Sequence, residues 1–223
     1  MIKDFSIENM YTLTESMAGE ELKGYTYPWE VLPHIGEIIL KLSETLSEDF
    51  EKKGENIWIH KTAKVAPTAS ITGPCIICEN AEIRHCAFIR GNALVGAGAV
   101  VGNSTELKNV ILFNKVQVPH YNYVGDSILG FKSHMGAGSI TSNVKSDKTL
   151  VVVKDRESGE KFETGLKKMG AMLADNVEVG CGSVLNPGTV IGQECIIYPL
   201  SSVRGCVKAR SIYKNKDGIV DRQ

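Results

Sequence analysis

The chain has 223 residues, a formal net charge of -1 and 23% charged residues. Its length predicts one large domain with an appendage, and its balanced charge excludes a global electrostatic field that would favour nucleic acid or an anionic membrane. The first eleven residues lack the apolar run of a signal peptide, and no stretch approaches the ~20 apolar residues of a membrane span, so we expect a cytoplasmic protein with neither a nucleic-acid nor a membrane partner.

Residues 1–55 form a segment without the repeat that marks the rest of the chain. Apolar side chains recur in it at helical spacing. They are Val31, Leu32, Ile35, Ile38, Ile39, Leu42 and Leu46. This spacing predicts an amphipathic helix. We expect the segment to pack on the repeat domain and to close one of its ends, as the terminal caps of repeat arrays do.

Residues 56–207 carry a six-residue repeat. Large apolar residues recur at every sixth position. They are Ile59, Val65, Ile71, Ile77, Ile83, Ile89, Val95, Val101, Leu107 and Phe113, then, with single-residue slips, Val118, Val124, Leu129, Met135 and Ile140, and again in strict sixes Leu173, Val179, Leu185, Ile191, Ile197 and Val203. A period of six fits neither a helix nor one long strand. It predicts short strands joined by turns and stacked as a parallel β-helix, with the apolar residues inside.

Small residues occupy the position two places before most of these apolar residues. Cys75 and Cys195 stand at that position, where other repeats have Ala, Ser or Thr. We therefore interpret these two cysteines as packing residues. No paired Cys or His clusters with the spacing of metal ligands occur, so we expect no metal site.

Residues 145–168 interrupt the repeat, and residues 208–223 form a C-terminal tail beyond it. Two β-prone runs separated by a polar turn predict that the interruption is a β-hairpin. Seven basic residues decorate it: Lys145, Lys148, Lys154, Arg156, Lys161, Lys167 and Lys168. Such residues either attract a phosphorylated ligand or solvate an exposed ribbon, and the sequence leaves both open.

Two sets of residues in the repeat point to chemistry. His120 lies between aromatic residues where the repeat slips, and an imidazole is a suitable general base near neutral pH. The alternative is a buried, hydrogen-bonded histidine. Arg90 and Lys108 are eighteen residues apart, three hexads, which places them on one edge, one coil apart. They form either a cationic cleft for a sugar phosphate or a chance pair of surface cations.

A family resemblance rests on four motifs that appear in order over about residues 57–205. They are Arg90-Gly-Asn, Gly102-Asn-Ser-Thr-Glu-Leu-Lys108, Pro119-His-Tyr-Asn-Tyr-Val-Gly-Asp126 and Gly136-Ala-Gly-Ser-Ile-Thr-Ser-Asn143. They resemble the left-handed β-helix acyltransferases, and most closely the acetyltransferase half of bifunctional N-acetylglucosamine-1-phosphate uridyltransferases. The run Glu163-Thr-Gly-Leu-Lys-Lys-Met-Gly resembles their archaeal-type branch, which carries an inserted hairpin. No glycine-rich nucleotidyltransferase loop accompanies them.

The resemblance implies an all-β solenoid, a left-handed parallel β-helix, that assembles as a homotrimer and transfers an acetyl group from acetyl-CoA to an amino-sugar phosphate. It implies that His120 is the base, with Tyr123 and Asn143 beside it as catalytic residues. The substrate would be bound by Arg90, Lys108, Tyr123, His134 and Lys148. The acetyl-CoA groove would be lined by Ala137, Ser139 and Cys181. His134 stands where bacterial members have asparagine, and the residues after Asn143 also depart from the family pattern, which leaves the acceptor open between glucosamine-1-phosphate, galactosamine-1-phosphate and another amine.

Two rival functions remain. A γ-type carbonic anhydrase uses the same fold with three histidine ligands, and His85 and His120 have about the right separation, although Gly125 stands where the third ligand should be. Alternatively, the chain is a non-catalytic platform that pairs with a separate sugar-1-phosphate nucleotidyltransferase through its N-terminal segment.

Overall fold

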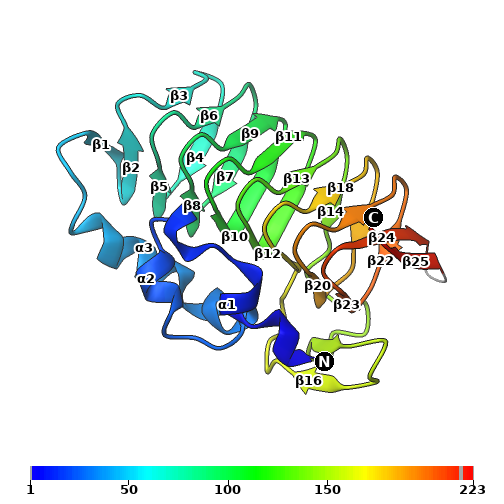
Figure 1. Cartoon of the computed structure of the whole chain (residues 1–223). Helices are drawn as coiled ribbons and strands as arrows, with labels where there is room; N and C mark the ends of the chain where they lie inside the picture. The colour runs from blue at the N-terminus through cyan, green and yellow to red at the C-terminus, as the bar shows by residue number, and fades with distance from the viewer. Residues whose placement is uncertain (1, 216–217, 223) are drawn as a thin grey trace.

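The computed structural model describes residues 2–215 and 218–222, and most of them form a parallel β-helix with three faces (Figure 1). Face I contains β2 (Ile57–His60), β5 (Cys75–Ile77), β8 (Ala93–Val95), the second halves of β10 (Glu106–Leu112) and β12 (Tyr123–Leu129), β17 (Ala171–Leu173), β20 (Thr189–Ile191) and β23 (Cys206–Val207). Face II contains β4 (Ser70–Thr72), β7 (Phe88–Arg90), the first halves of β10 and β12, β14 (Ile140–Thr141), β19 (Val184–Leu185) and β22 (Ser202–Val203). Face III contains β3 (Lys64–Val65), β6 (Glu82–Ile83), β9 (Val100–Asn103), β11 (Gln117–His120), β13 (His134–Met135), β18 (Glu178–Val179), β21 (Ile196–Ile197) and β24 (Ser211–Asn215).

The structure confirms the predicted left-handed β-helix of hexapeptide repeats. Most of the apolar residues of the six-residue series are buried in its core, and the first three, Ile59, Val65 and Ile71, are partly buried. Two members of the series are wrongly placed. Leu112, not Phe113, pairs with the inward Val95, and the Phe113 ring instead stacks on Tyr11 of the N-terminal segment. Thr141, not Ile140, pairs with the inward Leu185 and is fully buried, because the slips move the inward position by one residue. Cys75 and Cys195 are buried, as their small-residue positions predicted.

The edges between faces are tight turns with left-handed backbone. Asn109 and Asp126 have φ of 55° and 48° where β10 and β12 bend from face II to face I. Asparagine and aspartate tolerate this region better than most residues because their short polar side chains bond locally. Each coil is therefore three short straight segments, and residues at equivalent positions of successive coils stack along an edge.

Most of the N-terminal segment lies along face I, while its last part, β1 (Phe50–Gly54), pairs with β2 at one end of the solenoid. It contains η1 (Ile2–Phe5), α1 (Ile7–Met10), η2 (Leu13–Glu15), α2 (Gly19–Leu22), η3 (Pro28–His34) and α3 (Ile35–Ser43). The predicted helix is a 3-10 turn followed by a short α-helix, since Pro33 interrupts the pattern. Asn109 Nδ2 donates to the Leu32 carbonyl at 3.1 Å, which ties the segment to the face II/I edge.

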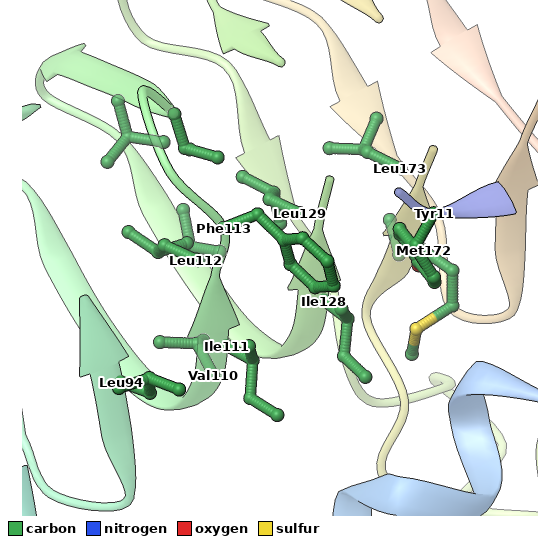
Figure 2. Close-up of a cluster of buried hydrophobic side chains, with 14 of the residues drawn as sticks. Tyr11, Leu94, Val110, Ile111, Leu112, Phe113, Ile128, Leu129, Met172 and Leu173 are labelled. Atoms are coloured by element: carbon green, nitrogen blue, oxygen red, sulfur yellow. The ribbon is translucent and has the colours of Figure 1, made fainter. Parts of the chain in front are cut away.

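Face I is consequently buried on both sides. Figure 2 shows Ile111, Ile128 and Met172 on the side of the strands opposite to Leu112, Leu129 and Leu173. All six are fully buried, the first three under the N-terminal segment and the last three in the solenoid core. Tyr11 of this segment stacks on the ring of Phe113 at a centroid distance of 5.0 Å. The helical part of the segment therefore covers a whole face of the solenoid.

The predicted hairpin is present, with β15 (Val152–Lys154) antiparallel to β16 (Lys161–Glu163). Phe162 of β16 packs on Tyr27 and Trp29 of the N-terminal segment, with ring centroids 5.1 and 5.4 Å apart. β1 (Phe50–Gly54) and β25 (Gly218–Asp221) add antiparallel strands at the two ends of the solenoid. β1 pairs the terminal edge of face I at one end, and β25 pairs that of face III at the other.

Candidate active site

Arg90 and Lys108 lie next to each other on face II. The register of β7 and β10 pairs Ile89 with Leu107, so the residue after each stands on adjacent coils of one column. Both side chains are partly exposed. The eighteen-residue spacing thus predicts their arrangement correctly.

Each of these two cations already has a carboxylate partner. Arg90 Nη1 lies 2.6 Å from Glu106 Oε1, and Lys108 Nζ lies 3.6 Å from Asp126 Oδ2. The formal charge of the four groups therefore sums to zero. The two acidic partners were missed in the sequence, although Glu106 and Asp126 both lie within the motifs that carry the resemblance.

Asp126 joins several site residues through hydrogen bonds. Its carboxylate is buried and accepts from Asn109 Nδ2 at 3.0 Å and from Asn143 Nδ2 at 2.5 Å. Asn143 Nδ2 also donates to the Tyr123 hydroxyl oxygen at 3.2 Å. Burial raises the pKa of Tyr123 above its usual value, and the nearby carboxylates Asp126 and Glu106 raise it further. The Tyr123 hydroxyl consequently stays protonated at neutral pH and is available as a donor.

Gly125 makes room for the Tyr123 side chain. A Cβ added at Gly125 would lie 2.5 Å from the Tyr123 hydroxyl oxygen, so the phenol crosses over this glycine. Gly125 occupies the coil after Lys108 in the same column. The missing side chain therefore lets the Tyr123 hydroxyl lie in the Arg90–Lys108 column, close to Asn143.

His120 lies at the end of β11, at the edge where each coil passes from face III to face II. Its side chain is exposed, and no described residue forms a hydrogen bond with its imidazole. Its backbone N–H donates to Asn122 Oδ1 at 3.1 Å, and the buried Asn122 amide donates to the carbonyls of Gly136 and Ser139 at 2.9 and 3.0 Å. The alternative of a buried, hydrogen-bonded histidine does not describe His120.

Two of the residues predicted to line the acetyl-CoA groove continue the edge on which His120 lies. The Gly138 N–H donates to the His120 carbonyl at 3.0 Å, and the next coils repeat this bond to the carbonyls of Ala137 and Cys181, each at 2.9 Å. Ala137 and Cys181 therefore stack beyond His120. Ser139 does not share this exposed edge, because its fully buried hydroxyl donates to the Gly136 carbonyl at 2.7 Å. Ser139 stands two places before the inward Thr141, at the position where the repeat favours small buried residues.

His134 and Lys148 lie apart from the face II cluster. His134 is on face III, where its Nδ1 is 2.9 Å from Glu178 Oε2 of the next coil. Lys148 is exposed in the turn before the hairpin, with φ of 58° and its N–H bonded to the Lys145 carbonyl at 3.1 Å. Within this chain, neither side chain joins the Tyr123–Asn143–Asp126 hydrogen bonds.

The three-histidine arrangement of the carbonic anhydrase alternative is not assembled. Over residues 2–215 and 218–222, no three His, Cys, Asp or Glu side chains come together in a group that could hold a metal ion. His85 instead has its Nδ1 2.7 Å from Thr68 Oγ1 and its Nε2 3.2 Å from Cys86 Sγ. None of the helices in the described part of the chain is long and apolar enough to cross a membrane.

Comparison with known proteins places these features in a family context. The chain is 32% identical over 210 residues to the bifunctional protein GlmU of Methanococcus maripaludis strain C5, covering 91% of this chain and 50% of that protein. It is 29% identical over 161 residues to the bifunctional sugar-1-phosphate nucleotidylyltransferase/acetyltransferase of Sulfurisphaera tokodaii, covering 64% of this chain and 40% of that protein. The chain is related to archaeal-type GlmU proteins. It spans about half the length of these relatives.

Two further comparisons concern the solenoid. A family model described as the GMPPB C-terminal domain matches residues 71–156. The hexapeptide transferase family protein of Anaplasma phagocytophilum aligns with a TM-score of 0.49 at 19% identity, covering 75% of this chain and 79% of that protein. The matched range 71–156 includes most of the predicted site residues, from Arg90 to Asn143 and Lys148.

Proposed function

We propose that this chain is an acetyl-CoA-dependent N-acetyltransferase acting on an amino-sugar 1-phosphate. One observation carries the proposal. On a solenoid related to GlmU, the Tyr123–Asn143–Asp126 hydrogen bonds lie on face II, and the exposed imidazole of His120 lies at the adjoining edge. A base, a neutral donor and a charged binding face are the groups that amide formation from a thioester requires.

The reaction would need no covalent intermediate on the protein. The sugar amine attacks the thioester carbonyl of acetyl-CoA while His120 takes a proton from the amine. The Tyr123 hydroxyl, which is neutral near pH 7, donates to the oxyanion of the tetrahedral intermediate. When the intermediate collapses, the C–S bond breaks and the thiolate of CoA takes the proton from His120.

The proposed active form is a homotrimer in the cytoplasm. The face of a solenoid is shallow, and a deep site for two substrates is best formed between two copies of the chain. The edge that carries His120, Ala137 and Cys181 would then line the acetyl-CoA groove. His134 and Lys148, which lie apart within one chain, would contact the acceptor only if a neighbouring copy brings face III or the Lys148 turn to face II.

The platform alternative requires the N-terminal segment as a docking element. That segment packs its apolar side chains Val31, Ile35 and Ile39 to complete burial within this chain. These side chains are thus not available to a separate nucleotidyltransferase, which favours the catalytic proposal.

The test measures release of free CoA thiol from acetyl-CoA, with glucosamine-1-phosphate and galactosamine-1-phosphate as acceptors. We expect thiol release that depends on one of these acceptors, together with an N-acetylated sugar phosphate identified by mass spectrometry. Release at the same rate without acceptor, or none with either sugar from a trimeric preparation, would contradict the proposal.

A further inference from the structure

A groove of about 410 Å³ lies beyond Asn143, between face II and the inserted hairpin. Its polar lining includes Ser142, Lys145, Lys154, Asn186 and Arg204. The volume is within the ~300–1,000 Å³ range of small-molecule sites. None of the residues predicted for the acceptor or for acetyl-CoA lines this groove.

The groove continues the face II column in which Arg90 and Lys108 stand. The Ser142 N–H donates to the Leu185 carbonyl at 2.8 Å, and the Asn186 N–H donates to the Val203 carbonyl at 3.0 Å, so Ser142, Asn186 and Arg204 occupy successive coils. Coils are about 4.8 Å apart, which places the Arg204 backbone roughly 10 Å beyond Ser142. Because Ser142 directly precedes Asn143, the groove begins beside the candidate active site.

The groove has an excess of positive charge that the predicted phosphate cleft lacks. Lys145, Lys154 and Arg204 line it together with a single acidic residue, Asp147, whose Oδ2 lies 3.3 Å from Lys145 Nζ. No carboxylate of the described residues pairs with Lys154 or Arg204. The formal charge of the lining is therefore +2 (three cations and one carboxylate), whereas Arg90 and Lys108 are both paired with carboxylates.

Two glycines hold the hairpin against the solenoid and so define the groove wall. A Cβ at Gly188, where φ is 80°, would lie 2.9 Å from Val151 Cγ1, and a Cβ at Gly205, where φ is 72°, would lie 2.5 Å from the Lys154 carbonyl oxygen. Any other residue at either position would push the hairpin away. These two glycines thus allow the hairpin backbone at Lys154 to lie close to the turn at Arg204.

We propose that this groove binds the phosphate of the acceptor, which extends the proposed function and rests on it. An amine held beside Tyr123 and Asn143 leaves a sugar 1-phosphate group within reach of Ser142 and Lys145. A second phosphate, as in a nucleoside-diphosphate amino sugar, would extend to Lys154 and to the forked guanidinium of Arg204. For Lys145 and Lys154, which line the groove, the proposal selects ligand binding over solvation of an exposed ribbon.

The first experiment titrates inorganic phosphate and pyrophosphate into the full chain by calorimetry at low ionic strength. The groove variant combines Lys154→Gln with Arg204→Gln. The control variant combines Lys115→Gln with Lys132→Gln, which removes the same charge from two exposed lysines beside Phe131 on another edge. We expect pyrophosphate affinity to fall about tenfold or more in the groove variant, and less than about twofold in the control. Absence of pyrophosphate binding by the wild type, or equal losses in both variants, would overturn the proposal.

The second experiment measures KM for an amino-sugar 1-phosphate and for a nucleoside-diphosphate amino sugar in the same variants. Because Lys154 and Arg204 are assigned to the second phosphate, we expect the KM of the groove variant to rise for the nucleoside-diphosphate amino sugar and to change little for the amino-sugar 1-phosphate. A KM increase for both acceptors would overturn this assignment of Lys154 and Arg204. Unchanged KM values for both would refute the groove as the acceptor site. If no acceptor is acetylated but pyrophosphate binding still depends on Lys154 and Arg204, the acetyltransferase proposal fails and the phosphate site stands.

Discussion

Faces I and II are built from the same six-residue repeat but have opposite outer surfaces. On face I the outward residues are apolar and fully buried: Ile76, Leu94, Ile111, Ile128, Met172 and Val190. On face II the outward positions of the central coils hold Phe88, Arg90, Glu106, Lys108 and Tyr123, which are partly or largely exposed. The repeat therefore fixes the inward residues of every face alike, and the outward residues decide whether a face is covered or open to ligand.

The largest expected effect comes from removing an outward side chain of face I. Ile111→Ala leaves a cavity under the N-terminal segment and should lower the free energy of unfolding by about 2–5 kcal/mol. Ile196→Ala is the matched control, since Ile196 is an outward residue of face III with no such cover. Urea denaturation of both variants measures the difference, which should vanish if face I is not covered in solution.

A smaller effect is expected where the cover is attached to the solenoid. The buried Asp175 carboxylate accepts the Thr12 N–H at 2.7 Å and the Phe131 N–H at 2.8 Å. Asp175→Asn would direct an amide N–H at one of these donors, which should cost about 1–3 kcal/mol of unfolding free energy.

The same substitution should change how stability depends on pH. Burial raises the pKa of Asp175, so the folded chain holds this proton more tightly than the unfolded chain. That contribution is complete below the ordinary carboxyl pKa and is lost as the pH rises through the raised value. Denaturation at about pH 4 and about pH 7 should therefore show a larger difference between wild type and Asp175→Asn at the lower pH. A larger difference at the higher pH would contradict the raised pKa.

The smallest effect on stability is expected on the open face. Tyr123→Phe removes the hydroxyl that is proposed to donate to the oxyanion and that accepts from Asn143. We expect kcat to fall about 10²–10³-fold, with little change in stability. Because the pKa of Tyr123 is raised, wild-type activity should not decline through tyrosine ionisation below about pH 10. Tyr198→Phe is the control, because Tyr198 is an exposed tyrosine after β21 on face III, outside the predicted site. Equal kcat values for the two variants would remove Tyr123 from the mechanism.

The period of six was enough to predict the solenoid, most of its inward residues and the stacking of Arg90 on Lys108. These follow from the sequence because each depends on position within one coil. The covered face could also have been predicted, because an apolar residue recurs about every eighteen positions, from Ile76 to Leu94 and Ile111. This outward series was missed because its residues lie in the same strands as the inward residues, whose six-residue period is the more obvious pattern.

The sequence could not reveal which charges are paired. Glu106 and Asp126 neutralise Arg90 and Lys108 through side-chain geometry that no spacing encodes. The cationic groove was equally hidden, since Lys154 and Arg204 are fifty residues apart and meet only because Gly188 and Gly205 admit the hairpin. Long-range packing of the insertion on the repeat is the part that local patterns leave undetermined.

The most direct test of the central claim compares acetyl-CoA turnover by wild type, His120→Ala and His85→Ala with the preferred amino-sugar phosphate. His85 is the matched control because it is an exposed histidine on the same edge as His120, two coils earlier. A general base contributes roughly 10²–10⁴-fold, so kcat should fall by that factor in His120→Ala and remain near wild type in His85→Ala. Wild-type turnover in His120→Ala would contradict acetyl transfer at this site.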